Sequence, residues 1–260
     1  MALMLENRCP NCDQEFAEGQ IFCAHCGQKL IIDKLGVGQS LRVFWSTMVY
    51  PVLALGRALL VSPGYVAHDY VQGKRKRFLG PYAFLFLTVG LASAAVALSG
   101  FQMIHGKEID LGTEAEPLNA QAVAAADAFF QRHVNLIILL DTPLLAAFCR
   151  LLFRKEGMSF AEHLVLASYA SGIRSLFTTI VVIPSSLILF RLFATDSAYF
   201  LMASLLVWIS YFAFAMNQFS RHHGLASALK GALAALFAWI STLVVISAVT
   251  MGYILQFSHR

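Results

Sequence analysis

The sequence predicts a mostly α-helical, multispanning membrane bundle with a small cysteine-rich segment at its N-terminus. The chain has 260 residues, of which 58% are hydrophobic and 13% charged, whereas soluble domains are nearer half apolar and a quarter charged. Its apolar residues form long runs, each near the ~20 residues that a bilayer requires, and short polar pieces separate them. Four of the five cysteines lie between Cys9 and Cys26. We therefore expect about five transmembrane helices, an interfacial helix and an N-terminal metal site.

Three segments follow from this pattern. Residues 1–34 form the cysteine-rich segment, residues 35–79 an interfacial amphipathic helix and a basic elbow, and residues 80–260 the transmembrane helical domain. The N-terminus lacks the basic start, apolar centre and small-residue cleavage site of a signal peptide. We therefore expect the first segment to stay in the cytoplasm.

The cysteine-rich segment has the spacing of a tetrahedral metal site. Cys9 and Cys12 form one C-x2-C pair, and Cys23 and Cys26 form a second after ten intervening residues. Thiolates suit Zn²⁺, and four of them leave no position for a substrate, so we expect a structural zinc ribbon with a tight hairpin. Two disulfides or free thiols are the alternatives, and the missing export signal favours zinc. Because so short a ribbon has almost no core, the metal should supply most of its folding free energy.

Residues 41–65 are apolar, but they make a poor spanning helix. Arg42 and Arg57 lie within or at the edge of this stretch, and Pro51 interrupts it. Charges and helix-breaking residues disfavour a lipid-facing span. We expect an amphipathic helix that lies at the interface or dips into the bundle, which keeps the ribbon and the basic elbow on one side of the membrane.

The elbow that follows is the most polar segment next to the predicted bundle. Glycine and proline residues mark sharp bends in it. Its basic cluster consists of Lys74, Arg75, Lys76 and Arg77. These side chains could hold anionic lipid headgroups or a phosphate-bearing ligand, or they could act only as an orientation signal.

Five spans are expected in the rest of the chain, at residues 81–101, 134–153, 164–190, 199–219 and 229–257. With the N-terminus inside, the basic loops fall on the cytoplasmic side and the acid-rich stretch 105–127 falls outside. This arrangement predicts a multi-pass protein of a bacterial inner membrane, with a cytoplasmic N-terminus and a periplasmic C-terminus.

Two charged residues lie inside predicted spans, where an unpaired charge is costly. Asp141 is twelve residues before Phe153, and Arg174 is twelve residues after Glu162. At ~1.5 Å per residue both lie roughly 15 to 18 Å from the inner edge, so we expect them to meet across an antiparallel hairpin. The pair could be a proton or ion relay, but a clamp that fixes the helix register is favoured.

Glu162 and His163 form a possible polar site at the cytoplasmic edge of the third span. They could take part in metal binding or acid–base catalysis. The favoured interpretation is a capping box, in which Ser159 caps the helix and Glu162 completes the S-x-x-E pattern.

Several motifs together resemble a bacterial family of uncharacterised membrane proteins with an N-terminal zinc ribbon, the domain of unknown function 3667. They are the CPNC and CAHCGQK knuckles, Pro63-Gly64, Tyr70, Gly73, Arg75, Arg77, Phe78, Pro81 and Glu162-His163-Leu164-Val165. The resemblance covers most of the chain, although hydropathy rather than motif carries it beyond Ile173. It implies the fold and the zinc ribbon but no activity.

Three functions remain open at this point. The favoured one is a non-enzymatic adaptor or assembly factor whose ribbon docks a protein partner or lipid. A small-solute or ion transporter or channel is the alternative, although the chain shows no repeated halves. A lipid-modifying intramembrane enzyme is disfavoured, because no HExxH, GxSxG or phosphate-binding glycine loop is present. We expect no nucleic-acid partner, because Asp13, Glu15 and Glu18 make the ribbon tip acidic.

Overall fold

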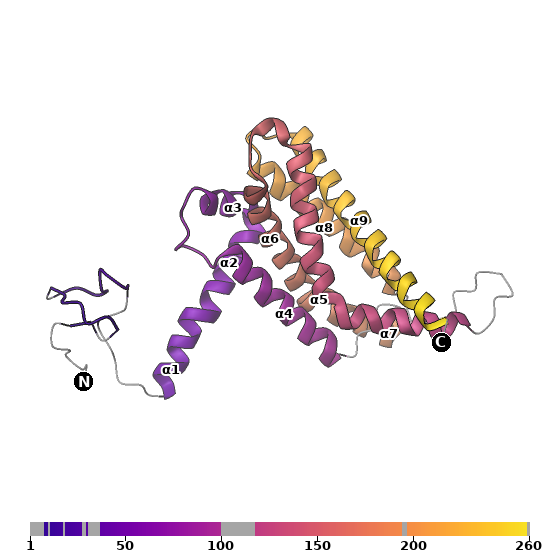
Figure 1. Cartoon of the computed structure of the whole chain (residues 1–260), viewed down its shortest axis with the longest axis horizontal. Helices are drawn as coiled ribbons and strands as arrows, with labels where there is room; N and C mark the ends of the chain where they lie inside the picture. Colours follow the sequence, from indigo (N-terminus) through magenta and orange to yellow (C-terminus); the bar gives the residue numbers. More distant parts are fainter. Residues whose placement is uncertain are drawn as a thin grey trace. The chain divides into compact units, whose positions relative to one another are not determined.

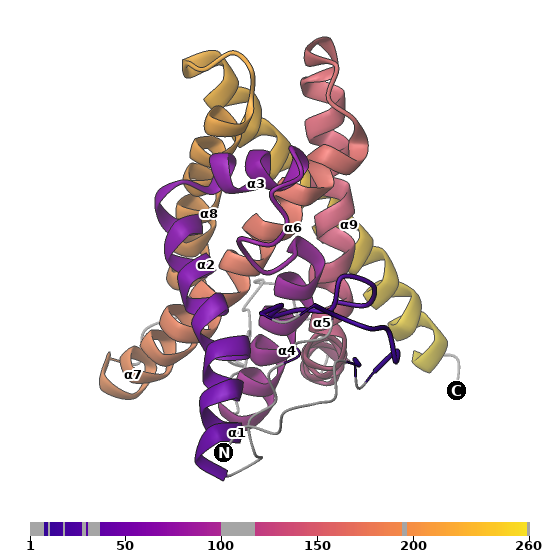
Figure 2. The same ribbon diagram turned by 90° about the vertical axis from the view of Figure 1, so that its left-hand side faces the viewer.

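Most of the described chain is helical, and it divides into two compact units, residues 1–51 and 52–260. The structure is a computed structural model that describes residues 8–9, 11–17, 19–27, 30, 37–99, 118–193 and 197–258. The first unit holds the cysteine-rich segment and the second a bundle of helices (Figures 1 and 2). The predicted fold class, a helical membrane bundle with an N-terminal ribbon, is confirmed.

The described part of the chain contains nine α-helices. They are α1 (Val37–Phe44), α2 (Tyr50–Val61), α3 (Pro63–Val71), α4 (Pro81–Ser99), α5 (Leu118–Leu152), α6 (Phe160–Phe177), α7 (Ile183–Phe193), α8 (Ser197–Phe219) and α9 (Leu225–Ser258). A π-helical segment joins α1 to α2 and another joins α6 to α7, and a 3₁₀ turn follows α5. Pro63 and Pro81 each begin a helix. Proline is suited to this position, because the first N–H groups of a helix have no partner within the helix and the missing one costs nothing.

Four stretches are long and apolar enough to cross a membrane: Pro81–Ser99, Phe160–Ile188, Met202–Phe219 and Leu225–Val249. They coincide with four of the five predicted spans. The remaining predicted span, residues 134–153, coincides with the second half of α5, a single helix of 35 residues that ends at Leu152. Within the bundle α5, α6, α8 and α9 pack against one another, and α8 and α9 run side by side (Figure 1).

The predicted interfacial segment 35–79 is divided between the two units, because the boundary follows Pro51. Its second half packs into the bundle through α2 and α3. Leu55 and Leu59 are fully buried in the bundle core, and the Tyr211 hydroxyl of α8 donates a hydrogen bond to the Leu59 carbonyl at 3.1 Å. The interfacial position of the first half stays a prediction.

Helix α3 packs closely against α8 because Gly64 has no side chain. A Cβ atom there would lie 2.5 Å from the carbonyl oxygen of Ala215 and 2.5 Å from the amide nitrogen of Phe219. The Gly64 amide also donates a hydrogen bond to Oε1 of Gln218 at 3.1 Å. Glycine therefore brings the backbones of α3 and α8 into direct contact.

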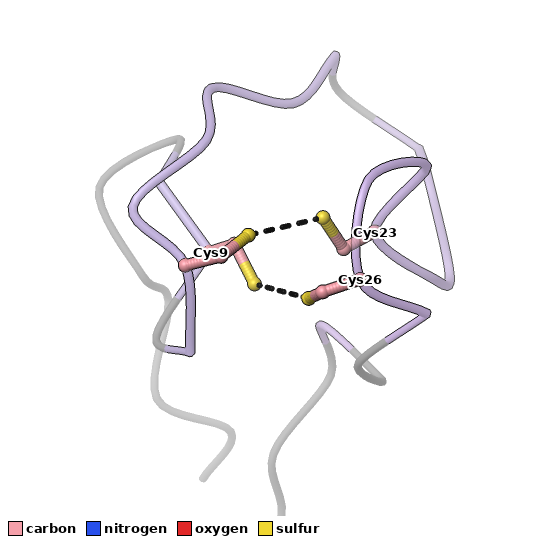
Figure 3. Close-up of side chains that lie close together, drawn as sticks. Cys9, Cys23 and Cys26 are labelled. Carbon is pink, nitrogen blue, oxygen red and sulfur yellow. Dashed lines mark hydrogen bonds between the residues drawn. The ribbon is translucent and has the colours of Figure 1, made fainter.

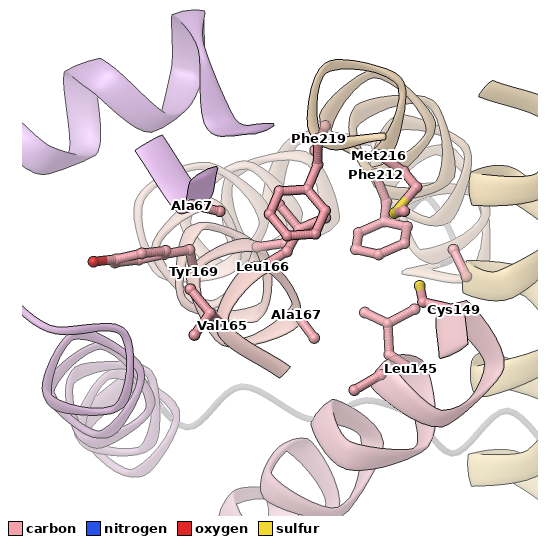
Figure 4. Packing of buried hydrophobic residues seen from close by; sticks show 14 of the residues in the cluster. Ala67, Leu145, Cys149, Val165, Leu166, Ala167, Tyr169, Phe212, Met216 and Phe219 are labelled. Carbon is pink, nitrogen blue, oxygen red and sulfur yellow. The ribbon is translucent and has the colours of Figure 1, made fainter. Parts of the chain in front are cut away.

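Helix α6 begins the most buried of the candidate spans, and eleven of its eighteen residues are buried. Figure 4 shows side chains from four helices meeting around it: Ala67 of α3, Leu145 of α5, Leu166 of α6 and Phe212 of α8. The Tyr169 hydroxyl of α6 donates a hydrogen bond to the Leu79 carbonyl at 2.8 Å, which fastens the end of the elbow to the bundle. The core therefore centres on α6.

We expect the Gly64→Ala substitution to lower the stability of the bundle by about 1–3 kcal/mol, because the added methyl group would force α3 away from α8. Gly56→Ala is the matched control, since a Cβ at Gly56 meets no atom within 4 Å. Thermal unfolding of the purified protein in detergent, followed by circular dichroism, measures both. Equal transition temperatures for the two variants would contradict the close contact.

Candidate functional site

The four ribbon cysteines converge on one point. Their Sγ atoms all lie within 4.8 Å of one another, with 3.6 Å between Cys9 and Cys26 and 3.7 Å between Cys12 and Cys23 (Figure 3). Sulfurs bound tetrahedrally at about 2.3 Å from a metal lie about 3.8 Å apart. The separations therefore fit a single four-coordinate metal-binding site formed by the four thiolates.

Turns in the backbone place each cysteine pair. The Asp13 amide donates to the Cys9 carbonyl at 2.9 Å, and the Gly27 amide donates to the Cys23 carbonyl at 2.9 Å. Asp13 and Gly27 both have positive φ angles, 55° and 75°, so the chain bends sharply directly after each pair. Glycine adopts such a backbone without strain, which explains Gly27 in the sequence.

The Cys12 thiol needs a nearby cation to ionise. A backbone hydrogen bond from Gln14 lowers the pKa of Cys12, but burial and hydrogen bonds to the three neighbouring thiols outweigh it and raise this pKa to about 12. A bound metal ion would reverse this balance, because it stabilises thiolates over thiols. All four positions are then taken by sulfur, so the site has a structural role and no open position for a reaction.

Inside the bundle, Asp141 and Arg174 lie in contact. Nη2 of Arg174 is 2.6 Å from Oδ2 of Asp141, whose side chain is only 5% exposed. Oδ1 of Asp141 accepts a hydrogen bond from the Thr242 hydroxyl at 3.0 Å, and the Arg174 guanidinium lies 4.8 Å from the ring centroid of Trp208. The cluster therefore joins α5, α6, α8 and α9.

Thr242 and Trp208 were missed by sequence reasoning. Neither residue stands out in an apolar helix, and Thr242 is 101 positions from Asp141. Thr242 gives the second carboxylate oxygen of Asp141 a hydrogen-bond partner, and Trp208 places an aromatic face beside the Arg174 guanidinium. A satisfied pair of this kind favours the clamp over the relay.

Two basic side chains of the elbow form ion pairs with an acid close to them in the sequence. Nζ of Lys74 is 2.7 Å from one Asp69 carboxylate oxygen, and Nη1 of Arg77 is 3.5 Å from the other. The hydrogen bond from Lys74, together with the nearby positive charges, lowers the pKa of Asp69. Arg75 lies over an aromatic ring of α3, and Lys76 is exposed. Two of the four predicted cations therefore shape the elbow itself.

Glu162 and His163 have different hydrogen-bond surroundings. Oε2 of Glu162 accepts from the Ser159 amide at 2.5 Å, and the Glu162 amide donates to the Ser159 hydroxyl at 3.2 Å, which is a complete capping box. The His163 ring is buried, with its centroid 6.3 Å from that of Phe153 and 6.1 Å from that of Phe219. Within the described residues neither ring nitrogen of His163 has a hydrogen-bond partner.

We expect the Asp141→Leu substitution to cost about 3–5 kcal/mol, because it leaves the Arg174 guanidinium unpaired inside the bundle. The double variant Asp141→Leu with Arg174→Met removes both charges and should unfold much closer to the wild type. Denaturant unfolding in detergent measures the difference, with Thr242→Val, expected to cost about 1 kcal/mol, as a reference for the loss of one hydrogen bond. A double variant as unstable as the single one would rule out the clamp.

Comparison with known proteins identifies two parts of the chain. The model of a protein of unknown function (DUF3667) matches residues 56–92, and the model of a zinc-ribbon domain matches residues 6–30. No curated protein and no solved structure matches the chain. The two matched segments contain all four ribbon cysteines, α3 and the basic elbow. Both matches agree with the resemblance that the sequence motifs indicate: residues 6–30 are similar to a zinc-ribbon domain, and residues 56–92 are similar to the protein family of unknown function DUF3667.

Proposed function

We propose that this protein is a membrane-bound, non-enzymatic adaptor or assembly factor whose ribbon docks a protein partner. The observation that carries the proposal is an apolar pair on the ribbon surface. Ile21 and Phe22, directly before Cys23, are 54% and 58% exposed. Exposed apolar side chains beside a closed structural metal site are suited to binding a partner rather than to a reaction.

The ion proposed for the cysteine site is zinc. Four thiolates at tetrahedral separations suit Zn²⁺, and the zinc-ribbon match supports this choice. Within the described part of the ribbon the buried core comprises Cys9, Cys23 and Leu30, with Cys12 and Phe16 packed against it. Because three of these five residues are metal ligands, the ribbon's folding should depend on the ion.

The proposed location is a bacterial inner membrane with the ribbon in the cytoplasm and the C-terminus in the periplasm. The charge distribution supports this orientation, because the elbow and the loops after α5 and α8 are basic. Those two loops lie together at one end of the bundle, where the Arg221 amide donates a hydrogen bond to Oε2 of Glu156 at 2.9 Å. A reducing compartment would also keep the thiols free for metal.

A transporter is the second candidate, because a charged pair buried inside a helical membrane bundle can also mark a path for ions or solutes. Charged residues at this depth often mark an ion or solute path. If the pair lies in such a path, flux of a small solute or of protons into liposomes should fall at least about tenfold in Asp141→Asn relative to the wild type. Absence of flux in the wild type for every solute tried would leave the clamp as the role of the pair.

The docking proposal predicts a crosslinked complex in cells that depends on the ribbon surface. A membrane-permeant crosslinker should capture a partner of the wild-type protein, and the Ile21→Ser, Phe22→Ser variant should lose it while retaining one zinc per chain by mass spectrometry. Glu15→Gln, another exposed change on the ribbon, is the matched control and should retain the partner.

The Cys23→Ser, Cys26→Ser variant separates folding from docking. It should lose both zinc and the partner, whereas Cys149→Ser, a buried change in the bundle, should keep both. Capture by an impermeant reagent on intact cells would contradict the cytoplasmic location. A wild-type protein that is always recovered alone would contradict the adaptor function itself.

A further inference from the structure

Helix α5 carries an exposed apolar stripe along one face. Leu136, Leu140 and Leu151 are 62%, 43% and 57% exposed, and Ala147 is also exposed. At about 100° of rotation per residue, these four positions lie within one narrow sector of the helix. Leu136 and Leu151 are fifteen residues apart, which is roughly 22 Å along the helix and exceeds half of a ~30 Å hydrocarbon core. The stripe is therefore long enough to follow a lipid acyl chain.

Two arginines stand at the end of this stripe, Arg150 in the last turn of α5 and Arg154 in the 3₁₀ turn that follows. Both are exposed, and together with Ala147 and Leu151 they line an open hollow of about 330 Å³. The ion pairs found among the described residues all involve other cations, so neither guanidinium has a carboxylate of that part of the chain within 4.0 Å. The hollow thus combines two unpaired cations with an apolar floor.

At the basic elbow, an acid already engages two of the four cations. The single carboxylate of Asp69 lies 2.7 Å from Lys74 and 3.5 Å from Arg77, so it offsets part of their combined charge. The nearest acid after Arg154 along the chain is Glu156, and its carboxylate accepts a hydrogen bond from the Arg221 amide. The charge of Arg150 and Arg154 therefore remains available to a ligand.

We propose that this face of α5 is a binding site for an anionic phospholipid. The phosphate lies between the guanidinium groups of Arg150 and Arg154, which present planar sets of N–H donors suited to phosphate oxygens. An acyl chain follows the stripe from Leu151 toward Leu136. The apolar floor selects a lipid over free phosphate, because free phosphate gains nothing from contact with Leu151 and Ala147. This site is independent of the ribbon and of its proposed partner.

The test is native mass spectrometry of the full-length protein, delipidated in detergent and titrated with phosphatidylglycerol or phosphatidylcholine. The wild type should bind phosphatidylglycerol in preference, and R150Q/R154Q should bind it at least about tenfold more weakly. K74Q/R77Q changes the charge by the same amount at the elbow and should bind like the wild type. Equal binding by the wild type and R150Q/R154Q, a larger loss in K74Q/R77Q, or full competition by inorganic phosphate would overturn the proposal.

A second measurement, photo-crosslinking to lipid, leaves both arginines in place. A photo-crosslinking residue at Ala147 should capture phosphatidylglycerol in preference to phosphatidylcholine from a mixed bilayer. The same residue at Leu243, an exposed position on α9, should show no such preference. Equal capture of the two lipids at Ala147 would overturn the proposal.

Discussion

The contact between Asp141 and Arg174 is the constraint on which the arrangement of the bundle depends. Each charge would be costly alone inside an apolar bundle, and each is stabilised chiefly by the other. The pair fixes the register of α5 against α6, and its contacts with Thr242 and Trp208 extend that register to α9 and α8. Apolar side chains alone would leave the helices freer to slide or rotate, because their packing is less directional.

The sequence predicted most elements of this bundle and the two partners of its buried Asp141–Arg174 ion pair. Hydropathy located the spans, and counting residues from a shared turn placed Asp141 and Arg174 at one depth. The contacts of α3 could not be predicted in the same way. Gly64 touches a helix more than 150 positions away in the chain, and no local pattern in the sequence shows such a contact.

In the candidate sites too, local sequence patterns predicted some features, whereas features that depend on packing in space could not be predicted. The spacing of the four cysteines is a local property, so it predicted their convergence. The exposure of Ile21 and Phe22, and the pairing of Lys74 and Arg77 with Asp69, depend on how side chains pack in space. A run of basic residues in the sequence therefore overstated the free charge at the elbow.

The short turn between α5 and α6 bears on how the protein enters the membrane during synthesis. Gly157 reverses the chain with a φ of 75°, and the Ser159–Glu162 capping box begins α6 directly afterwards. Because Asp141 and Arg174 lie on the two sides of this turn, neither helix can be released into lipid alone without exposing a charge. The two helices should therefore leave the translocation machinery together, as a preformed hairpin.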